Sequence, residues 1–234
     1  MIGPRGCHDG LVIGTLNEGS LHAALKRWYA APGDLVEHPV DGYVVDLIRD
    51  ELLIEVQTGG FAALRSKLDD LTERHPVRVV APIPLTRTII KMSDEGEPVS
   101  SRRSPKHGRI EDIFARLVSI PKLIEREGFE LDILLTVEDE IRVHRPGQAW
   151  RRNGWVVLGR SLVEVVESRM VRDPGDLVRM LPVGLPADFS TADVAESARL
   201  SRRVAQQMIY CLRATGMVEV VGKEGNTLIY RKAD

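Results

Sequence analysis

The chain has 234 residues, of which 43% are hydrophobic and 28% charged, and its net charge is −2 because 32 Lys and Arg residues face 34 Asp and Glu residues. This balance excludes the globally basic surface of a histone-like nucleic-acid-binding protein, and the length indicates one or two domains at about 150 residues each. No apolar run approaches the ~18 residues of a membrane span, and Cys7 and Cys211 fit neither a zinc site nor a disulfide framework, so we expect a cytoplasmic protein with no membrane contact.

The part of the chain before residue 93 predicts helices packed on a sheet. Apolar residues at three- and four-residue spacing predict amphipathic helices over residues 16–31 and 61–75. Short runs of β-branched and apolar residues predict strands over residues 43–48, 52–56 and 77–83. A turn at residues 49–51 joins the first two strands as a hairpin. The order of these elements favours a mixed sheet with helices on it.

The next part of the chain begins with a polar segment over residues 93–109 that is rich in Pro, Gly and Ser and predicts a flexible loop. The elements expected after this loop are a helix over 110–126 broken near Pro121, a second hairpin of strands over 131–137 and 140–144, a strand over 155–158 and a helix over 162–171. Pro174-Gly175 then begins the last section. We therefore place a domain boundary near residue 172, between a domain of residues 1–172 and one of residues 173–234.

Two acidic residues are expected to meet in the first hairpin. Asp46 ends one strand, and Glu55 and Gln57 share one face of the next because side chains alternate along a strand. The hairpin brings Asp46 opposite or diagonal to Glu55. Two carboxylates repel each other unless a cation holds them, and hard oxygen ligands suit Mg²⁺ or Mn²⁺. In the alternative, the carboxylates are solvated or pair with Arg49 and Arg65.

This part of the chain, about residues 14–84, resembles the PD-(D/E)xK nuclease superfamily, whose fold is that of many restriction endonucleases. The resemblance is carried by Asp46, eight intervening residues and then Glu55-Val56-Gln57, followed by a helix and a strand. Gln57 stands where the commonest form of the motif has Lys, and Val45 stands where the motif has Pro. Some members of the superfamily have Gln or Glu at the Lys position.

The resemblance implies metal-dependent hydrolysis of phosphodiester bonds in DNA. Asp46, Glu55 and the backbone carbonyl of Val56 would bind Mg²⁺ or Mn²⁺, which lowers the pKa of a bound water. Gln57 would position that water, and Glu18 on the preceding helix would bind or orient a second ion. For Glu18 the alternative is stabilisation of the helix dipole. Degenerate members keep the fold and lose the metal, so the alternative function is a non-catalytic DNA-binding or regulatory protein with a nuclease-like scaffold.

The last section, residues 174–233, resembles a winged helix-turn-helix domain. It contains predicted helices over 176–181, 191–198 and 201–215 and paired strands over 218–221 and 227–230. A recognition helix in a major groove would place basic and amide side chains near bases and phosphates, and the candidates, including one in the wing, are Arg199, Arg202, Arg203, Gln206, Gln207 and Lys223. In the alternative, the domain is a protein-interaction winged helix and its arginines form a solvated face.

Taken together, the sequence predicts an α/β protein with a restriction-endonuclease-like mixed sheet flanked by helices, followed by a C-terminal winged helix domain. The expected partner is nucleic acid, with DNA preferred, and the expected cofactor is Mg²⁺ or Mn²⁺. Because nucleases that cut both strands often act as dimers, a homodimer is a further expectation. A protein-interaction module that touches no nucleic acid is a third hypothesis.

Overall fold

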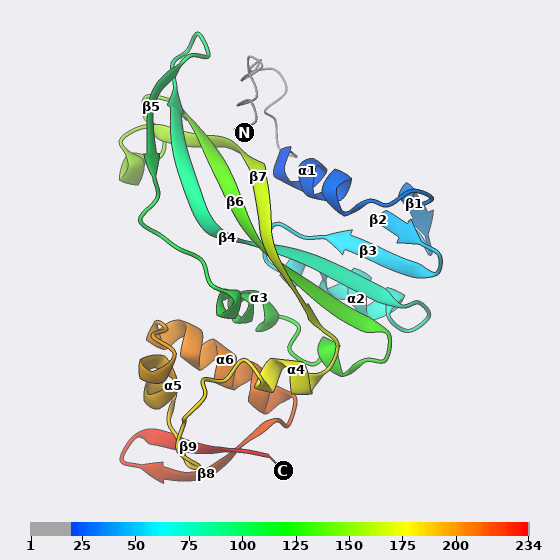
Figure 1. Cartoon of the computed structure of the whole chain (residues 1–234), viewed down its shortest axis with the longest axis vertical. Coiled ribbons are helices and arrows are strands. Elements are labelled where there is room, and N and C mark those ends of the chain that lie inside the picture. The colour runs from blue at the N-terminus through cyan, green and yellow to red at the C-terminus, as the bar shows by residue number, and fades with distance from the viewer. Residues whose placement is uncertain (1–19, 234) are drawn as a thin grey trace, which may run out of the picture.

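A computed structural model describes residues 20–233 of the protein (Figure 1). The main sheet contains β1 (Leu35–Val40), β2 (Tyr43–Arg49), β3 (Leu52–Val56), β4 (Val77–Met92), β5 (Pro98–Arg103), β6 (Phe129–His144) and β7 (Trp155–Val171). The helices are α1 (Ser20–Tyr29), α2 (Arg65–Leu71), α3 (Phe114–Leu117), α4 (Pro174–Val178), α5 (Thr191–Ser197) and α6 (Arg202–Ala214). A second sheet pairs β8 (Val218–Glu224) with β9 (Thr227–Lys232).

The main sheet is mixed, with the strand order β1-β2-β3-β4-β6-β7 and with β5 paired to β4. β1, β2 and β3 form an antiparallel meander, and the chain then crosses through α2 so that β4 lies parallel to β3. β6 is parallel to β4, and β7 returns antiparallel along β6. A mixed sheet flanked by helices is therefore confirmed as the architecture of this part of the chain.

Helices cover the two faces of the main sheet unequally. α1 covers one face, where Leu21 and Leu25 pack against Ile54, Val80 and Leu134 of the strands. The other face carries α2, α3, α4 and α6 (Figure 1). No helix within residues 20–233 combines the length and the apolar composition that crossing a bilayer requires.

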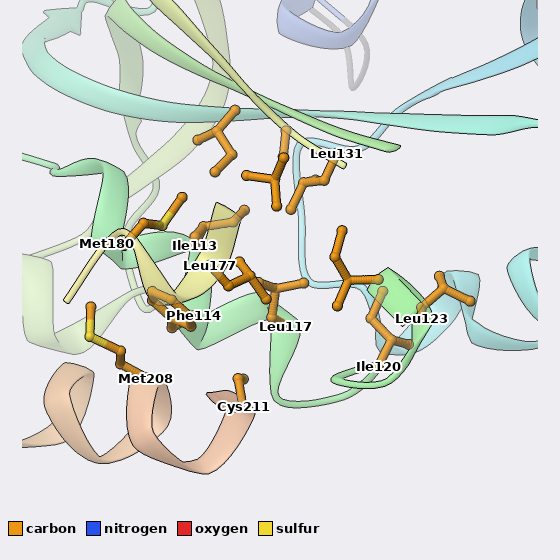
Figure 2. Close-up of a cluster of buried hydrophobic side chains, with 14 of the residues drawn as sticks. Ile113, Phe114, Leu117, Ile120, Leu123, Leu131, Leu177, Met180, Met208 and Cys211 are labelled. Carbon is orange, nitrogen blue, oxygen red and sulfur yellow. The ribbon is translucent and has the colours of Figure 1, made fainter. Parts of the chain in front are cut away.

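The core on this second face is continuous from the sheet to the C-terminal helices. Figure 2 shows side chains of α3 lying between the sheet and α6. Phe114 and Leu117 of α3 belong to the same buried cluster as Leu131 of β6 and as Met208 and Cys211 of α6. Because all five side chains are at most 1% exposed, the C-terminal helices are packed into the main core.

The prediction of a second hairpin is wrong, and so is the prediction of a helix over 162–171. The residues of the expected hairpin form the single strand β6, and residues 155–171 form the single strand β7. The two strands pair along their whole length, from Leu131 opposite Val171 to His144 opposite Trp155. Glu138 in the expected turn and Glu140 just after it are acidic, and their charges are compensated by arginines inside the sheet. The β-branched residues of 162–171 favour a strand, and this strand forms because it pairs with β6.

Three further differences concern the length of one strand and the presence of two strands that were not predicted. The strand predicted over 77–83 continues to Met92, and the segment predicted as a flexible loop contains β5, which pairs with β4. β1 was not predicted, because its residues are mostly exposed and include Pro39.

The helices predicted over 61–75 and 110–126 are shorter in the structure, whereas the C-terminal elements agree better with the prediction. The structure resolves the two into α2, α3 and short 3₁₀ turns over Ala62–Leu64, Ile110–Ile113 and Leu123–Glu125. The predicted break near Pro121 is confirmed, because α3 ends at Leu117 and the next turn begins at Leu123. The helices predicted over 191–198 and 201–215 are confirmed as α5 and α6, and the paired strands as parts of β8 and β9.

The shared core predicts that the protein unfolds as one unit. We expect Phe114→Ala to lower the free energy of unfolding by about 3–5 kcal/mol, because it removes a fully buried aromatic ring, and to move the signals of the sheet and of the C-terminal helices together. Chemical denaturation followed by circular dichroism and by tryptophan fluorescence measures both.

Trp150→Ala is the control, because the Trp150 side chain is 80% exposed, and its effect should stay within about 0.5 kcal/mol. Two separate transitions in the wild-type protein would contradict the continuous core.

Candidate active site

The first hairpin places two carboxylates next to each other. β2 and β3 pair antiparallel with Leu47 opposite Ile54, so Asp46 and Glu55 follow as the next residues of the two strands. The pairing of β2 with β3 ends there, and the Val56 amide donates to Asp46 Oδ2 at 2.9 Å. The prediction that Asp46 lies opposite or diagonal to Glu55 agrees with this register, in which the two residues directly follow the last pair.

Asp46 is held by basic side chains of α1. His22 Nε2 lies 3.0 Å from Asp46 Oδ2, and Lys26 Nζ lies 3.6 Å from Asp46 Oδ1. Burial raises the pKa of Asp46, but hydrogen bonds from His22 and the Val56 amide outweigh this effect and leave the pKa below its ordinary value. The same hydrogen bond raises the pKa of His22 against the opposing effect of burial. Asp46 is therefore ionised throughout the neutral range.

Glu55 is held by α2, on the other face of the sheet from α1. Lys67 Nζ donates to Glu55 Oε1 at 2.5 Å and to the Val44 carbonyl at 2.6 Å. Burial raises the pKa of Glu55, which is 5% exposed, and the charge of Asp46 adds to this rise while Lys67 opposes it. The pKa values of the two neighbouring carboxylates are thus shifted in opposite directions, a pattern that in active sites separates the roles of two acidic groups.

Gln57 lies at the end of β3 and is tied to the turn that follows. Its Nε2 donates to the Gly60 carbonyl at 2.7 Å. Its backbone carbonyl accepts a hydrogen bond from Arg116 Nη1 at 3.0 Å, and Arg116 Nη2 donates to the Pro82 carbonyl at 2.6 Å. Arg116 of α3 therefore joins the end of β3 to the middle of β4 beside the candidate site.

Sequence reasoning missed the basic residues of this site. Lys67 brings an ammonium group to Glu55, and it comes from α2, the helix after β3. His22 and Lys26 lie four residues apart on α1 and so share one face of that helix. The four-residue spacing of His22 and Lys26 is visible in the sequence. The contact of Lys67 with Glu55 is not, because it depends on how α2 packs on the hairpin.

The oxygen atoms of Asp46 and Glu55 are the donors that a divalent cation would use here. Mg²⁺ is commonly bound by one or two carboxylates together with waters and substrate oxygens, so a donor set of this chemistry fits it. Within residues 20–233, no group of three or more His, Cys, Asp or Glu residues is arranged to hold a metal ion. Glu18, the predicted ligand of a second ion, lies outside the described residues.

The structure divides the predicted DNA-binding residues of α6 into two sets. Arg202 and Gln206 are exposed on its outer side. Arg203 is exposed as well, but together with the half-buried Gln207 it lines a cavity between α6 and the main sheet. Figure 1 shows α6 lying between α3 and the second sheet.

The other two predicted DNA-binding residues lie at the ends of this region. Arg199 is exposed just before α6 in a left-handed backbone conformation with a φ of 51°, and its carbonyl accepts a hydrogen bond from Arg109. Lys223 is exposed on β8, near the turn into β9. The exposed members Arg199, Arg202, Arg203, Gln206 and Lys223 thus remain available to a partner.

Comparison with known proteins places this chain in a family. Residues 19–172 match a domain of unknown function, DUF8091. An uncharacterized protein of Treponema pallidum (strain Nichols) is 31% identical over 225 residues, which cover 95% of this chain and 88% of that protein. An alignment of that length extends beyond residue 172, so the relative shares the C-terminal helices as well as the sheet. No solved structure matches the chain.

The contact between His22 and Asp46 predicts a pH dependence of stability. Because folding raises the pKa of His22 from its ordinary value of 6.5, the contribution of protonated His22 is complete below that pH and is lost as the pH rises through the raised value. We expect the free energy of unfolding in urea to fall between pH 5.5 and pH 9 by more in the wild type than in His22→Gln.

His38→Gln serves as the control, because the His38 side chain is exposed on β1, and it should keep the wild-type pH dependence. An identical pH dependence in the wild type and His22→Gln would rule out the stabilising contact with Asp46.

Proposed function

We propose that this protein, which belongs to the DUF8091 family, is a metal-dependent nuclease that hydrolyses phosphodiester bonds in DNA. The observation that carries the proposal is the carboxylate pair Asp46 and Glu55 on adjacent strands, with Lys67 Nζ 2.5 Å from Glu55. Carboxylates that can hold a metal ion and an ammonium group that can stabilise developing negative charge suit metal-assisted phosphodiester hydrolysis.

The order of elements supports the resemblance to the PD-(D/E)xK superfamily. α1 is followed by the meander of β1, β2 and β3, then by α2 and by β4 parallel to β3. In this arrangement Asp46 lies on the middle strand of the meander, and Glu55 lies on the strand that pairs with β4. The motif and the topology, which are independent observations, thus agree on the same two residues.

In this proposal Asp46, Glu55 and Lys67 have different roles in the reaction. A divalent cation, when bound, lowers the pKa of a coordinated water and offsets charge on the phosphate. Asp46 and Glu55, together with the Val56 carbonyl, would hold that ion, and Asp46 is the permanently ionised member. Lys67 would orient the attacking water and stabilise negative charge that develops on the phosphate, a role for which the neutral Gln57 amide is poorly suited.

The C-terminal elements would act as a winged helix domain that binds DNA and so brings the carboxylate pair to it. Ser201 caps α6 by accepting a hydrogen bond from the Val204 amide. Arg202 and Gln206 are exposed on α6, and Lys223 lies at the position of the wing. In this proposal these three side chains contact DNA, while Arg203 and Gln207 line the cavity between α6 and the main sheet.

A second candidate is a non-catalytic DNA-binding or regulatory protein that uses the nuclease-like fold as a scaffold. The observation that favours it is that each carboxylate already has its own basic partner. Asp46 contacts His22 and Lys26, and Glu55 contacts Lys67. Such pairs are stable without a metal ion, because each buried negative charge is compensated.

Cleavage assays distinguish the two candidates. We expect the wild-type protein to cut plasmid, single-stranded or branched DNA with Mg²⁺ or Mn²⁺ and not with EDTA. Asp46→Asn, Glu55→Gln and Lys67→Met should each slow cleavage by at least about 100-fold, because each removes a group that acts on the reacting atoms.

Asp50→Asn is the matched control, because Asp50 is an exposed acid at the turn of the same hairpin, and it should cut like the wild type. Wild-type DNA binding without cleavage, unchanged in the three variants, would overturn the nuclease and support the scaffold.

Salt dependence tests the proposed DNA contacts. Each lost phosphate contact should reduce the slope of log affinity against log salt by about one, so Arg202→Gln and Lys223→Gln should each weaken binding and flatten this slope. Arg179→Gln is the control, because Arg179 is an exposed side chain at the end of α4. Unchanged affinity in both variants at low salt would show that α6 and β8 do not contact DNA.

A further inference from the structure

A cavity of about 490 Å³ lies where the start of α6 meets the main sheet and α3. Its walls come from β4, β7, the segment between β5 and α3, and the first turns of α6 (Figure 1). Five basic side chains line it, namely Arg87, Lys106, Arg116, Arg160 and Arg203. Ligand pockets in proteins commonly have volumes of about 300–1,000 Å³, so the cavity has the size of a small-molecule site.

Positive charge exceeds negative charge around this cavity. Asp112 is the one carboxylate among the lining residues. Behind the lining, the fully buried Glu138 accepts hydrogen bonds from Arg87 Nη2 at 3.2 Å and from Arg160 Nη1 at 3.4 Å. Glu140, also behind the lining, accepts a hydrogen bond from Arg87 Nη1 at 3.1 Å. These three carboxylates are fewer than the five basic side chains, so the cavity favours an anion.

Arg116 contributes a positive charge that no carboxylate accepts directly. Its two terminal nitrogens donate to the backbone carbonyls of Gln57 and Pro82. Burial, together with the neighbouring charge of Arg160, lowers the pKa of Arg116 to about 10. The guanidinium therefore stays protonated at neutral pH and adds a positive charge to the lining of the cavity.

Two buried polar atoms indicate where a ligand would bind. Within the described residues, the buried side-chain atoms without a hydrogen-bond partner are Arg87 Nε and Gln207 Oε1. Both residues line this cavity. An unsatisfied buried polar atom lowers the free energy of unfolding by about 1–3 kcal/mol. A ligand that accepts a hydrogen bond from Arg87 Nε and donates one to Gln207 Oε1 would remove this cost.

The backbone also favours an anion at this place. Ser201, the N-cap of the 13-residue helix α6, lines the cavity, so the positive end of the helix dipole lies beside it. Gly108 brings the segment with Lys106 close to β4, because its amide donates to the Pro84 carbonyl at 2.9 Å. A Cβ atom at Gly108 would lie 2.3 Å from that carbonyl oxygen, so no larger residue fits.

We propose that this cavity binds a phosphate-bearing ligand of nucleotide size. The basic side chains would hold the phosphate groups, and Arg87 Nε would supply one of the donors. The apolar side chains of Ile83 and Val204 would contact a ring, while Gln207 Oε1 would accept a hydrogen bond from an amino or hydroxyl group. The phosphate can belong to a free nucleotide or to the 5′ end of a strand, since both present the same group.

This site differs from the carboxylate pair in its residues and in its chemistry. Neither Asp46 nor Glu55 lines the cavity, and an anion site of arginines needs no metal ion. Binding can therefore be measured with EDTA present, and its outcome is independent of whether the protein cuts DNA.

Isothermal titration calorimetry of the full chain in EDTA tests the proposal. The probes are inorganic phosphate, pyrophosphate, ADP, ATP and a trinucleotide with and without a 5′-phosphate. We expect saturable binding of ATP or of the phosphorylated trinucleotide, and whichever of the two binds more tightly identifies the source of the phosphate. Arg203→Gln and Lys106→Gln should each weaken that binding about tenfold or more, because each removes a charged hydrogen bond.

Two further variants complete the test. Ala115→Phe should abolish binding by filling the cavity from α3 without a change of charge, and its circular dichroism spectrum checks that it folds. Arg102→Gln should bind like the wild type, because Arg102 is an exposed arginine of β5 away from the cavity. The proposal is overturned if no probe binds the wild type saturably, or if Arg203→Gln and Lys106→Gln bind as tightly as Arg102→Gln.

Discussion

The buried ion network in the middle of the main sheet is the constraint on which the rest of this structure depends. β6 carries Glu138 and Glu140 at 0% and 6% exposure, where an uncompensated charge would cost several kcal/mol. Arg87, Arg142 and Arg160 of the three long strands and Thr136 provide the compensation. The network thus allows an acidic stretch to continue as a strand, and it fixes the positions of two arginines that face the cavity beside α6.

α3 connects the regions where function is proposed, although it is a single turn of helix. One side of it enters the core with Phe114 and Leu117, which join the sheet to α6. From the same turn Arg116 reaches the backbone of β3 and β4 and also lines the cavity. The end of β3 after Glu55, the cavity and the C-terminal helices therefore all contact one short element, whose importance neither its length nor its composition indicates.

Local patterns predicted the parts of the molecule that local interactions determine. The hairpin with Asp46 and Glu55, the helices α5 and α6 and the break near Pro121 follow from neighbouring residues, and the structure has them. The long strands β6 and β7 were missed because each is completed by a partner far away in the sequence, and acidic residues in β6 resemble a turn until their arginines are known. Lys67 was missed for the same reason, since its contact with Glu55 arises when α2 packs on the hairpin.

The shared core also determines where this chain can be divided. A protein that ended near residue 172 would lose α6, and the side chains of Phe114 and Leu117 would then face water. Apolar surface of this kind promotes aggregation, so a chain cut near residue 172 would need another surface to cover these side chains. The same contact would transmit force in both directions, since a partner that pulls on α6 would pull on the element whose Arg116 holds the end of β3 and the middle of β4.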